Sequence, residues 1–385
     1  MVRGGTTEQL RRANLSRVLE LLHEDGPHSR ADLTRLVGSS RSTMAGVVTE
    51  LEELGLVAES MPELTGGAGR PSGVVSVNPD VVAVTVNPEV DAVHVGLVGL
   101  GGRVIKHARI EVPDTDVTTV VSLAAATIRG MLSDDPPRYR VLGVGLAVPG
   151  QVRISDGVVR QATHLGWSEV PLTDLITHAT GLPAWAANAA TLAMRAESRL
   201  GAGKGVADLV YLIGGASGVG GGAVVGGHLL TGSAGYAGEF GHTVVTPGGT
   251  PCHCGGRGCL EAEVDQATLL AAVGLGSADA GRLGERLKAS GDPEVVALVA
   301  DRSARLAVAV RNALNVFNPQ AIVLSGHLAA LHEASELDLI AEGVASSREA
   351  VEIRSAALGD EQLMIGAAEL VWSELLADPA GLLAR

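Results

Sequence analysis

The sequence predicts an α/β protein that carries a small winged helix-turn-helix domain at its N-terminus. Two observations support this prediction. Residues 8–60 place apolar side chains at helical spacing, interrupted by short glycine turns. Beyond residue 80, β-branched runs that end in glycine alternate with helical segments, which is typical of sheets covered by helices. We therefore expect a winged helix-turn-helix domain over 1–78 and an α/β domain over 79–385.

Three helices are expected in the first domain. The first has an apolar stripe formed by Leu15, Val18, Leu19 and Leu22. Gly26-Pro27 ends this helix, and Ser29 with Asp32 gives a cap-like start to a second. After a glycine turn, the third helix has an apolar face of Met44, Val47, Val48, Leu51 and Leu54. A tight turn before the third helix is the spacing of a helix-turn-helix.

Two strand-like segments, 56–58 and 74–77, follow the third helix. The glycine-rich turn between them, 65–71, carries Arg70 near its tip. This arrangement resembles a β-wing. Arg70 would then reach the adjacent minor groove of DNA, where the negative potential favours arginine.

The start of the third helix is the predicted DNA-reading surface. Its residues are short, polar or cationic: Ser40, Arg41, Ser42 and Thr43. Arg30 adds a cation upstream, whereas acidic residues gather at the far end of the third helix, over 50–53. This asymmetry favours double-stranded DNA as the partner. The alternative is a small helical protein-interaction module, because the domain as a whole has no excess of basic residues.

Composition excludes several classes of protein. The chain has 385 residues, 46% hydrophobic and only 2% aromatic, so we expect globular domains with aliphatic cores. The net charge of −14 argues against a protein whose whole surface binds polyanions. No apolar segment follows the charged N-terminus, and the longest stretch without Lys, Arg, Asp or Glu, 209–238, is rich in glycine. We expect a cytoplasmic protein without a membrane partner.

The α/β region shows hints of its architecture. We expect strands at 81–86, 92–98, 141–148, 209–213, 222–225 and 321–324, and helices at 117–132, 191–200, 302–315 and 361–376. Two strand–glycine–strand units, turned at Gly101-Gly102 and Gly226-Gly227, suggest an internal duplication.

The clearest chemical signal is a metal site. All three cysteines lie within one glycine-rich run, and a histidine precedes them. The set His242, Cys252, Cys254 and Cys259 offers four ligands to a structural Zn²⁺. His253 is the rival nitrogen ligand, and three unrelated buried thiols are the alternative to a metal. Four protein ligands would leave no open position for catalysis.

These residues resemble the ROK family of repressors, open reading frames and sugar kinases. The resemblance is carried by 239–242, by the Cys-x-Cys-Gly-x-x-Gly-Cys-Leu-Glu run over 252–261 and by 142–150, 165–167, 315–319 and 325–326. It covers nearly the whole chain. With the N-terminal domain and Gly69-Arg70-Pro71, the sequence is similar to the regulator branch, as in xylose and N-acetylglucosamine repressors.

The resemblance implies a two-lobed, actin-like fold of RNase H type with a sugar cleft between the lobes, and a homodimer or tetramer. We expect the small lobe over 79–187 and the large lobe over 188–385, with the C-terminal helix returning to the small lobe. By the same resemblance, the residues that read sugar hydroxyls are Asn188, Glu239, His242 and Glu261. The alternatives are that the two glutamates are solvated loop acids and that Asn188 caps the following helix.

Two positions argue against phosphoryl transfer. Active relatives carry a glycine-rich phosphate loop where this sequence has 87–91, with Pro88 and Glu89. They also carry an Asp as general base where this sequence has Ala189. The loop 217–220 still resembles a second phosphate loop, as a relic or a tight strand turn. We expect no ATP and no enzymatic activity.

The sequence thus predicts a transcriptional regulator of sugar metabolism, a repressor, with operator binding modulated by a sugar or sugar phosphate. The rival hypotheses are an active ATP-dependent sugar kinase and a regulator whose vestigial cleft is controlled by a partner protein. Binding of a palindromic operator by a homodimer is expected from the usual symmetry of such proteins.

Overall fold

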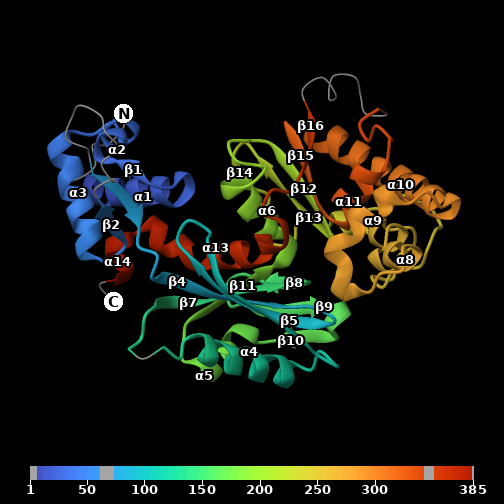
Figure 1. Ribbon diagram of the computed structural model, residues 1–385, viewed down its shortest axis with the longest axis horizontal. Helices are drawn as coiled ribbons and strands as arrows, with labels where there is room; N and C mark the ends of the chain where they lie inside the picture. Colours follow the sequence, from blue (N-terminus) through green and yellow to red (C-terminus); the bar gives the residue numbers. More distant parts are fainter. Residues whose placement is uncertain (1–6, 61–72, 135, 342–350, 384–385) are drawn as a thin grey trace.

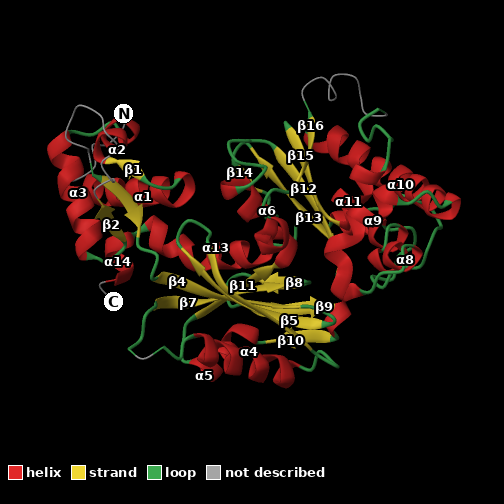
Figure 2. Ribbon diagram, in the orientation of Figure 1, coloured by secondary structure: helices red, strands yellow, loops and turns green. Residues whose placement is uncertain are grey.

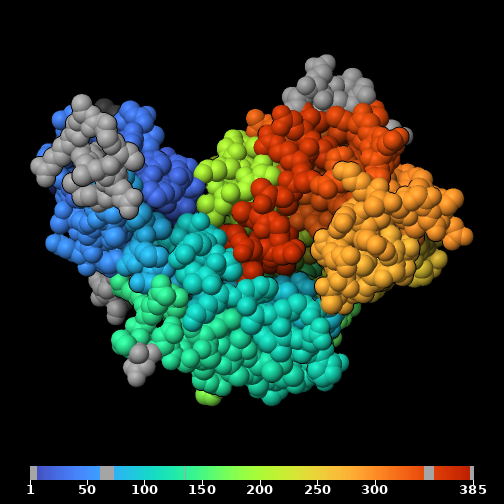
Figure 3. All heavy atoms as spheres, viewed as in Figure 1, coloured from blue at the N-terminus to red at the C-terminus, as the bar shows by residue number. Residues whose placement is uncertain are grey.

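The computed structural model describes residues 7–60, 73–134, 136–341 and 351–383. Figure 1 shows the N-terminal domain set beside two α/β lobes, with helix α13 passing between the N-terminal domain and the lobes. In the space-filling view of Figure 3, a notch separates the N-terminal domain from the large lobe. The prediction of an α/β fold behind an N-terminal helical domain is confirmed.

The N-terminal domain contains the three expected helices and a small antiparallel sheet. The helices are α1 (Thr7–Asp25), α2 (Arg30–Val37) and α3 (Arg41–Glu53). The sheet has the order β1-β3-β2, from β1 (His28–Ser29), β2 (Val57–Ser60) and β3 (Val74–Val77). Ser29 caps α2 by accepting a hydrogen bond from the Asp32 N–H at 3.1 Å, as the sequence predicts. The wing tip with Arg70 lies outside the described residues.

The small lobe is built on a five-stranded sheet of order β11-β7-β4-β5-β6. Its strands are β4 (Val81–Pro88), β5 (Ala92–Gly99), β6 (Val104–Glu111), β7 (Arg140–Val148) and β11 (Ala184–Asn188). A three-stranded antiparallel sheet lies beside it, formed by β8 (Gln151–Arg153), β9 (Val158–Ala162) and β10 (Trp167–Val170). Helices α4 (Val117–Met131) and α5 (Leu172–Thr180) and the 3₁₀ turn η1 (Thr163–Leu165) complete the lobe.

The large lobe repeats the topology of the main small-lobe sheet. Its order is β14-β13-β12-β15-β16, from β12 (Leu209–Gly215), β13 (Gly218–Val225), β14 (His228–Leu229), β15 (Ala321–Gly326) and β16 (Glu352–Ser355). In both sheets three antiparallel strands are followed by two strands that pair in parallel. The shared order supports the internal duplication that the glycine turns suggest.

The remaining helices cover the sheets, as Figure 2 shows. They are α6 (Ala189–Leu200), α7 (Leu260–Glu263), α8 (Gln266–Ala272), α9 (Leu283–Ala289), α10 (Pro293–Phe317), α11 (His327–Ala334), α13 (Gln362–Ala377) and α14 (Pro379–Leu383). Shorter 3₁₀ turns are η2 (Phe240–His242), η3 (Ser277–Arg282) and η4 (Gly359–Glu361). Helix α10 begins well before the expected residue 302, because Asp292 caps it and Pro293 occupies its first position. Among the described residues, no helix combines the length and apolarity needed to cross a membrane.

Helix α13 joins the N-terminal domain to the lobes. One apolar core contains Leu15 and Leu19 of α1 together with Trp372 and Leu375 of α13. On its other side, α13 passes so close to β7 that a Cβ on Gly145 would overlap the α13 backbone. The N-terminal domain is therefore packed onto the lobes through a shared core.

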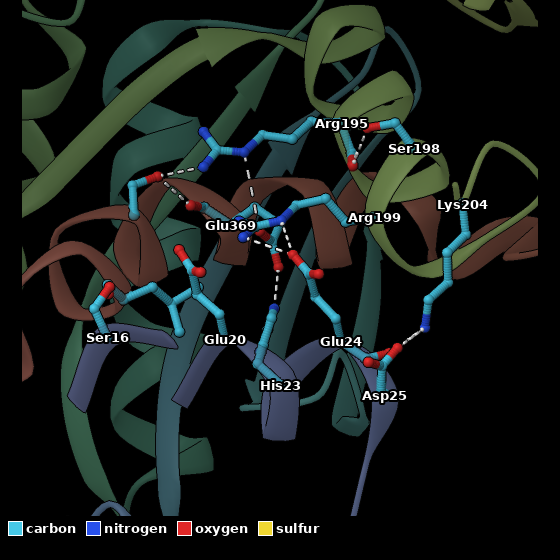
Figure 4. A network of polar contacts seen from close by, with 12 residues as sticks. Ser16, Glu20, His23, Glu24, Asp25, Arg195, Ser198, Arg199, Lys204 and Glu369 are labelled. Atoms are coloured by element: carbon cyan, nitrogen blue, oxygen red, sulfur yellow. Dashed lines mark hydrogen bonds and ion pairs between the residues drawn. The ribbon is translucent and has the colours of Figure 1, made fainter. Parts of the chain in front are cut away.

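A cluster of buried charges strengthens this junction (Figure 4). We call His23, Glu24, Arg195, Arg199 and Glu369 the interdomain cluster. His23 and Glu369 have no exposed side-chain surface, and the His23 Nε2 lies 2.6 Å from the Glu369 Oε1. Arg199 of α6 donates to both Glu369 and Glu24 at 2.8 Å, and so links α6, α13 and α1.

The interdomain cluster is electrostatically satisfied. His23 Nδ1 accepts a hydrogen bond from the Gly101 N–H at 2.8 Å, which leaves its Nε2 as the donor to Glu369. Burial by itself would raise the pKa of Glu369, but His23, Arg199 and Arg195 outweigh that effect and lower it to about 2. Glu369 is thus a buried carboxylate that is held ionised by its partners.

Candidate functional site

The site lies in a cleft lined by both lobes, with a cavity volume of about 360 Å³. This volume is within the usual range for small-molecule sites. The lining comes from the ends of β4, β7 and β11, the start of α6, the β12–β13 turn and the cysteine loop. The duplicated sheets therefore place their equivalent turns, β4–β5 and β12–β13, in one cavity.

The cysteine loop brings the four predicted metal ligands together. The ligand atoms of His242, Cys252, Cys254 and Cys259 all lie within 4.8 Å of one another. The Cys254 and Cys259 sulfurs are 3.7 Å apart, as are the Cys252 Sγ and the His242 Nδ1. Zinc–ligand bonds of about 2.0–2.3 Å in a tetrahedron require edges close to these lengths. The donor set therefore fits a four-coordinate Zn²⁺.

The chemistry of the thiols agrees with that fit. Burial, together with contacts to the other two thiols, raises the pKa of Cys259 to about 12. Three sulfurs at this separation would repel one another as thiolates unless a cation lay between them. When bound, zinc would tie the loop to η2 and hold it in a fixed conformation.

His253 lies beside this metal site, with its Nδ1 4.0 Å from the Cys252 Sγ, and directs the same nitrogen toward a carboxylate. Its Nδ1 lies 3.1 Å from Glu261 Oε1, and the His164 Nε2 lies 3.6 Å from the same oxygen. The other oxygen, Oε2, accepts a hydrogen bond from the Val219 N–H at 2.8 Å. Burial opposes the ionisation of Glu261, but these hydrogen bonds outweigh it and lower its pKa. The structure therefore fixes Glu261 as a carboxylate in the cleft.

All four residues proposed to bind sugar hydroxyls line the cleft, but they differ in exposure and in their hydrogen-bond partners. Glu239 is exposed, and its side chain has no hydrogen-bond or ion-pair partner among the described residues. His242 directs Nδ1 toward Cys252, which leaves Nε2 for another partner. Asn188 caps α6, because its Oδ1 accepts from the Thr191 N–H at 3.0 Å and its Nδ2 donates to Gly150 O at 2.9 Å. The capping role that the sequence left open for Asn188 is thus present, alongside its place in the lining.

The small-lobe side of the cleft is formed by the turn after β4. Asn87 is 4% exposed and donates from Nδ2 to the Glu89 Oε1 at 3.0 Å. Burial raises the pKa of Glu89. The Asn87 Oδ1 and, across the cleft, the Ser217 Oγ are buried without a hydrogen-bond partner in the described structure. Such atoms destabilise a fold unless a ligand or water satisfies them.

The predicted second phosphate loop is a tight strand turn. Gly215 pairs with Gly218 in the β12–β13 hairpin, so only Ala216 and Ser217 form the turn. Ala189 follows at the first position of α6, is buried and lines the cleft. Its methyl group offers no acceptor for a proton.

The predicted DNA-reading residues gather at the start of α3. Ser40 caps the helix by accepting from the Thr43 N–H at 3.1 Å, and its Oγ lies 2.9 Å from the Ser42 Oγ. Arg41 is exposed and makes no hydrogen bond or ion pair within the described part of the chain. Arg30 is different, because Glu59 binds it through two nitrogens at 2.9 and 2.7 Å. A DNA contact by Arg30 would have to displace Glu59.

Two groups of residues were missed by the sequence reasoning. His164, which shows no ligand spacing, reaches Glu261 because η1 folds over the cleft. Its place just before the 165–167 motif was the available signal. The interdomain cluster gave no signal, since His23 and Glu369 are 346 residues apart in the chain. Trp167, in the 165–167 motif, is buried and donates from Nε1 to Thr115 O at 2.7 Å.

Comparisons with known proteins match this architecture. The model of the ROK family matches residues 85–374. A xylose repressor of Caldicellulosiruptor bescii is 26% identical over 97% of this chain and 99% of its own length. A glucokinase of Halalkalibacterium halodurans is 31% identical over 71% of this chain and 93% of its own length.

A solved structure extends the match to the fold of the whole chain. A ROK family transcriptional regulator, described as a homologue of the E. coli MLC protein, superposes with a TM-score of 0.75. It is 24% identical, and the alignment covers 97% of this chain and 98% of that chain. The likeness supports the actin-like fold together with the N-terminal domain.

Proposed function

The chain belongs to the ROK family, and from this premise we propose that it is a DNA-binding transcriptional repressor of sugar metabolism. In this proposal a sugar in the cleft modulates operator binding, and phosphoryl transfer has been lost. The xylose repressor aligns with 97% of the chain, whereas the glucokinase aligns with 71%. The longer alignment favours the regulator branch.

The state of the cleft supports the loss of phosphoryl transfer. Ala189 stands where family resemblance places the general base, and no proton acceptor replaces it there. Pro88 has no N–H to offer a phosphate, and the adjacent Glu89 would repel one. A glucokinase-like activity remains the second candidate, because a glucokinase relative is 31% identical. Consumption of ATP with a panel of hexoses would establish that candidate.

The N-terminal domain would bind DNA through the start of α3. Arg41 is available there as an exposed cation, next to the hydroxyls of Ser40, Ser42 and Thr43. A helix that enters the major groove contacts bases and phosphates with such side chains. We propose a homodimer or tetramer that reads a palindromic operator, with structural zinc at His242 and the three cysteines.

Helix α6 is the observation that best supports ligand control. It begins at the Asn188 cap in the cleft and extends to Arg199 in the interdomain cluster. Lys204, just beyond α6, also contacts the N-terminal domain, with its Nζ 2.8 Å from Asp25 Oδ1. A rigid helix of this kind would transmit a shift at the cleft to α1, because both ends are held by specific contacts. Ligand closure of the lobes would then alter the placement of the DNA-reading helices.

The coupling is testable with a matched pair of substitutions on α1. Glu24→Gln weakens the contact with Arg199, whereas Glu20→Gln alters a residue that pairs only within α1, with Arg17 at 3.6 Å. We expect Glu24→Gln to reduce the effect of bound sugar on operator affinity about two- to tenfold. Fluorescence anisotropy on operator DNA, with and without sugar, measures this ratio. An unchanged ratio in Glu24→Gln would exclude this route, and sugar binding without any effect on the native protein would favour control by a partner protein.

A further inference from the structure

We propose that the effector is an uncharged, unphosphorylated sugar, and that the cleft excludes sugar phosphates. This inference rests on the proposed function, since it takes the cleft to be a sugar site. Three carboxylates line the cavity, from Glu89, Glu239 and Glu261. Neither lysine nor arginine occurs in the lining of the described cavity. Proteins that bind phosphate esters usually supply such cations.

The glycine turn that could bind an anion is already filled by a side chain of the protein. The Val219 N–H donates to the Glu261 Oε2 at 2.8 Å. The same oxygen lies so close to Gly218 that a Cβ there would overlap it. The Glu261 carboxylate thus occupies the anion position of the 217–220 turn, and a phosphate would have to displace it.

At the start of the opposite turn, between β4 and β5, residues 88 and 89 offer no free backbone donor for a phosphate. Pro88 has no N–H, and the Glu89 N–H donates to Ala92 O at 2.8 Å. The Asn87 Nδ2 is directed to Glu89. Two of the backbone N–H groups that could cradle a phosphate in a glycine-rich loop are therefore missing or used on this side, at Pro88 and Glu89.

Two of the residues that line the cleft carry a polar atom without a hydrogen-bond partner in the described structure. The buried Asn87 Oδ1 is an acceptor without a partner, and the buried Ser217 Oγ can donate and accept. A sugar hydroxyl can donate to the Asn87 Oδ1 and also accept from the Ser217 Oγ. A phosphate dianion has only acceptor oxygens, so the phosphate group itself cannot donate to the Asn87 Oδ1, and the carboxylates of the lining would repel its charge.

The test compares each sugar with its own phosphate ester on the full-length protein. D-glucose, D-mannose and N-acetyl-D-glucosamine would each be paired with the 6-phosphate, and D-xylose with its 1-phosphate, at constant ionic strength. Isothermal titration calorimetry measures the dissociation constants. We expect one free sugar to bind and its phosphate ester to bind at least about tenfold more weakly. A phosphate ester that binds as tightly as its parent sugar, or more tightly, would overturn the inference but leave the sugar-sensing proposal standing. Failure of every free and phosphorylated sugar to bind would refute both.

A substitution distinguishes the charge of the cleft from its shape. Glu89→Gln removes one carboxylate and keeps the side-chain length. We expect it to improve the affinity for the phosphate ester relative to the parent sugar about threefold or more. Glu285→Gln, on the exposed side of α9 outside the cleft, is the matched control and should leave the ratio unchanged. An equal ratio in Glu89→Gln and the native protein would contradict the role of Glu89 in exclusion.

Discussion

The interdomain cluster and the cleft both remove polar side chains from solvent, but every member of the cluster has a hydrogen-bond or ion-pair partner, whereas two polar atoms of the cleft have none. Glu369 has His23 and Arg199 as close partners, and both His23 nitrogens are used. In the cleft, the Asn87 Oδ1 and the Ser217 Oγ are buried without partners. An unsatisfied buried polar atom costs about 1–3 kcal/mol. The comparison indicates that the cluster is a structural junction, whereas the cleft is arranged for a ligand.

The largest expected effect is on the cleft, through loss of a proposed zinc ligand. Cys254→Ser removes one of the four proposed zinc ligands and should lower the free energy of unfolding by about 4 kcal/mol, because zinc would fix the whole loop. Zinc content by mass spectrometry and the melting temperature measure the result. Arg257→Ala, an exposed non-ligand in the same loop, is the control. Full zinc retention in Cys254→Ser would exclude Cys254 as a ligand.

The next largest effect is expected in the interdomain cluster, when its central carboxylate is neutralised. Glu369→Gln should lower the free energy of unfolding by about 3 kcal/mol at neutral pH, because the partly buried Arg199 and Arg195 would lose the counter-charge of a fully buried carboxylate. Glu374→Gln, exposed on the same helix, should have little effect. Thermal unfolding measures both variants. Equal melting temperatures for the two would contradict a structural role for the cluster.

The pH dependence of stability follows from the same carboxylate. The pKa of Glu369 falls from 4.5 to about 2 on folding, so its contribution is complete above about pH 4.5. It is lost as the pH falls toward 2, where the folded state must also bind the proton. We expect Glu369→Gln to flatten this acid limb of the stability profile. If Glu369→Gln and the native protein lost stability identically as the pH falls, the acid dependence of stability would arise from other groups.

Arg41 lies in neither the cleft nor the interdomain cluster. Its proposed contact is with DNA, so its substitution should affect operator binding and not stability. Arg41→Ala should weaken operator binding by about 1–3 kcal/mol and leave the melting temperature unchanged, since Arg41 has no partner within the described residues. Arg282→Ala, which removes an exposed arginine of the large lobe, controls for net charge. Anisotropy on operator DNA measures both. Native affinity in Arg41→Ala would remove Arg41 from the contact surface.

The smallest expected effect is at Ala189. Ala189→Asp restores a carboxylate at the start of α6 but not the glycine loop around Pro88. We therefore expect no ATP-dependent phosphorylation of any hexose above the rate of the native protein. A coupled assay for ADP measures it. Measurable turnover in this variant would show that the missing Asp at position 189 alone accounts for the loss of phosphoryl transfer, and that the altered loop around Pro88 does not prevent it.

Local patterns predicted most of the fold and the clustering of the four candidate zinc ligands. The cap of Ser29 on α2 and the clustering of three cysteines depend on residues close in sequence, so spacing alone indicates them. The repeated sheet order was suggested by glycine turns, because each turn lies within its own antiparallel hairpin.

The contacts that could not be predicted join distant segments. His23 meets Glu369 only after α13 folds back beside α1, and His164 meets Glu261 only after the two lobes assemble. Neither pair has a periodic or spacing signal. Arg30, a predicted DNA contact, is bound by Glu59 in the fold, and this pairing also gave no signal in the sequence.

The most direct measurement of the central claim is the affinity of the full-length protein for its operator as a function of sugar. An operator fragment selected from random-sequence DNA would be titrated by anisotropy, with and without a saturating sugar found by calorimetry. We expect the sugar to change the dissociation constant for the operator about 5- to 150-fold. Bound operator should change the dissociation constant for the sugar by the same factor. A sugar that binds the cleft and leaves operator affinity unchanged would contradict the account.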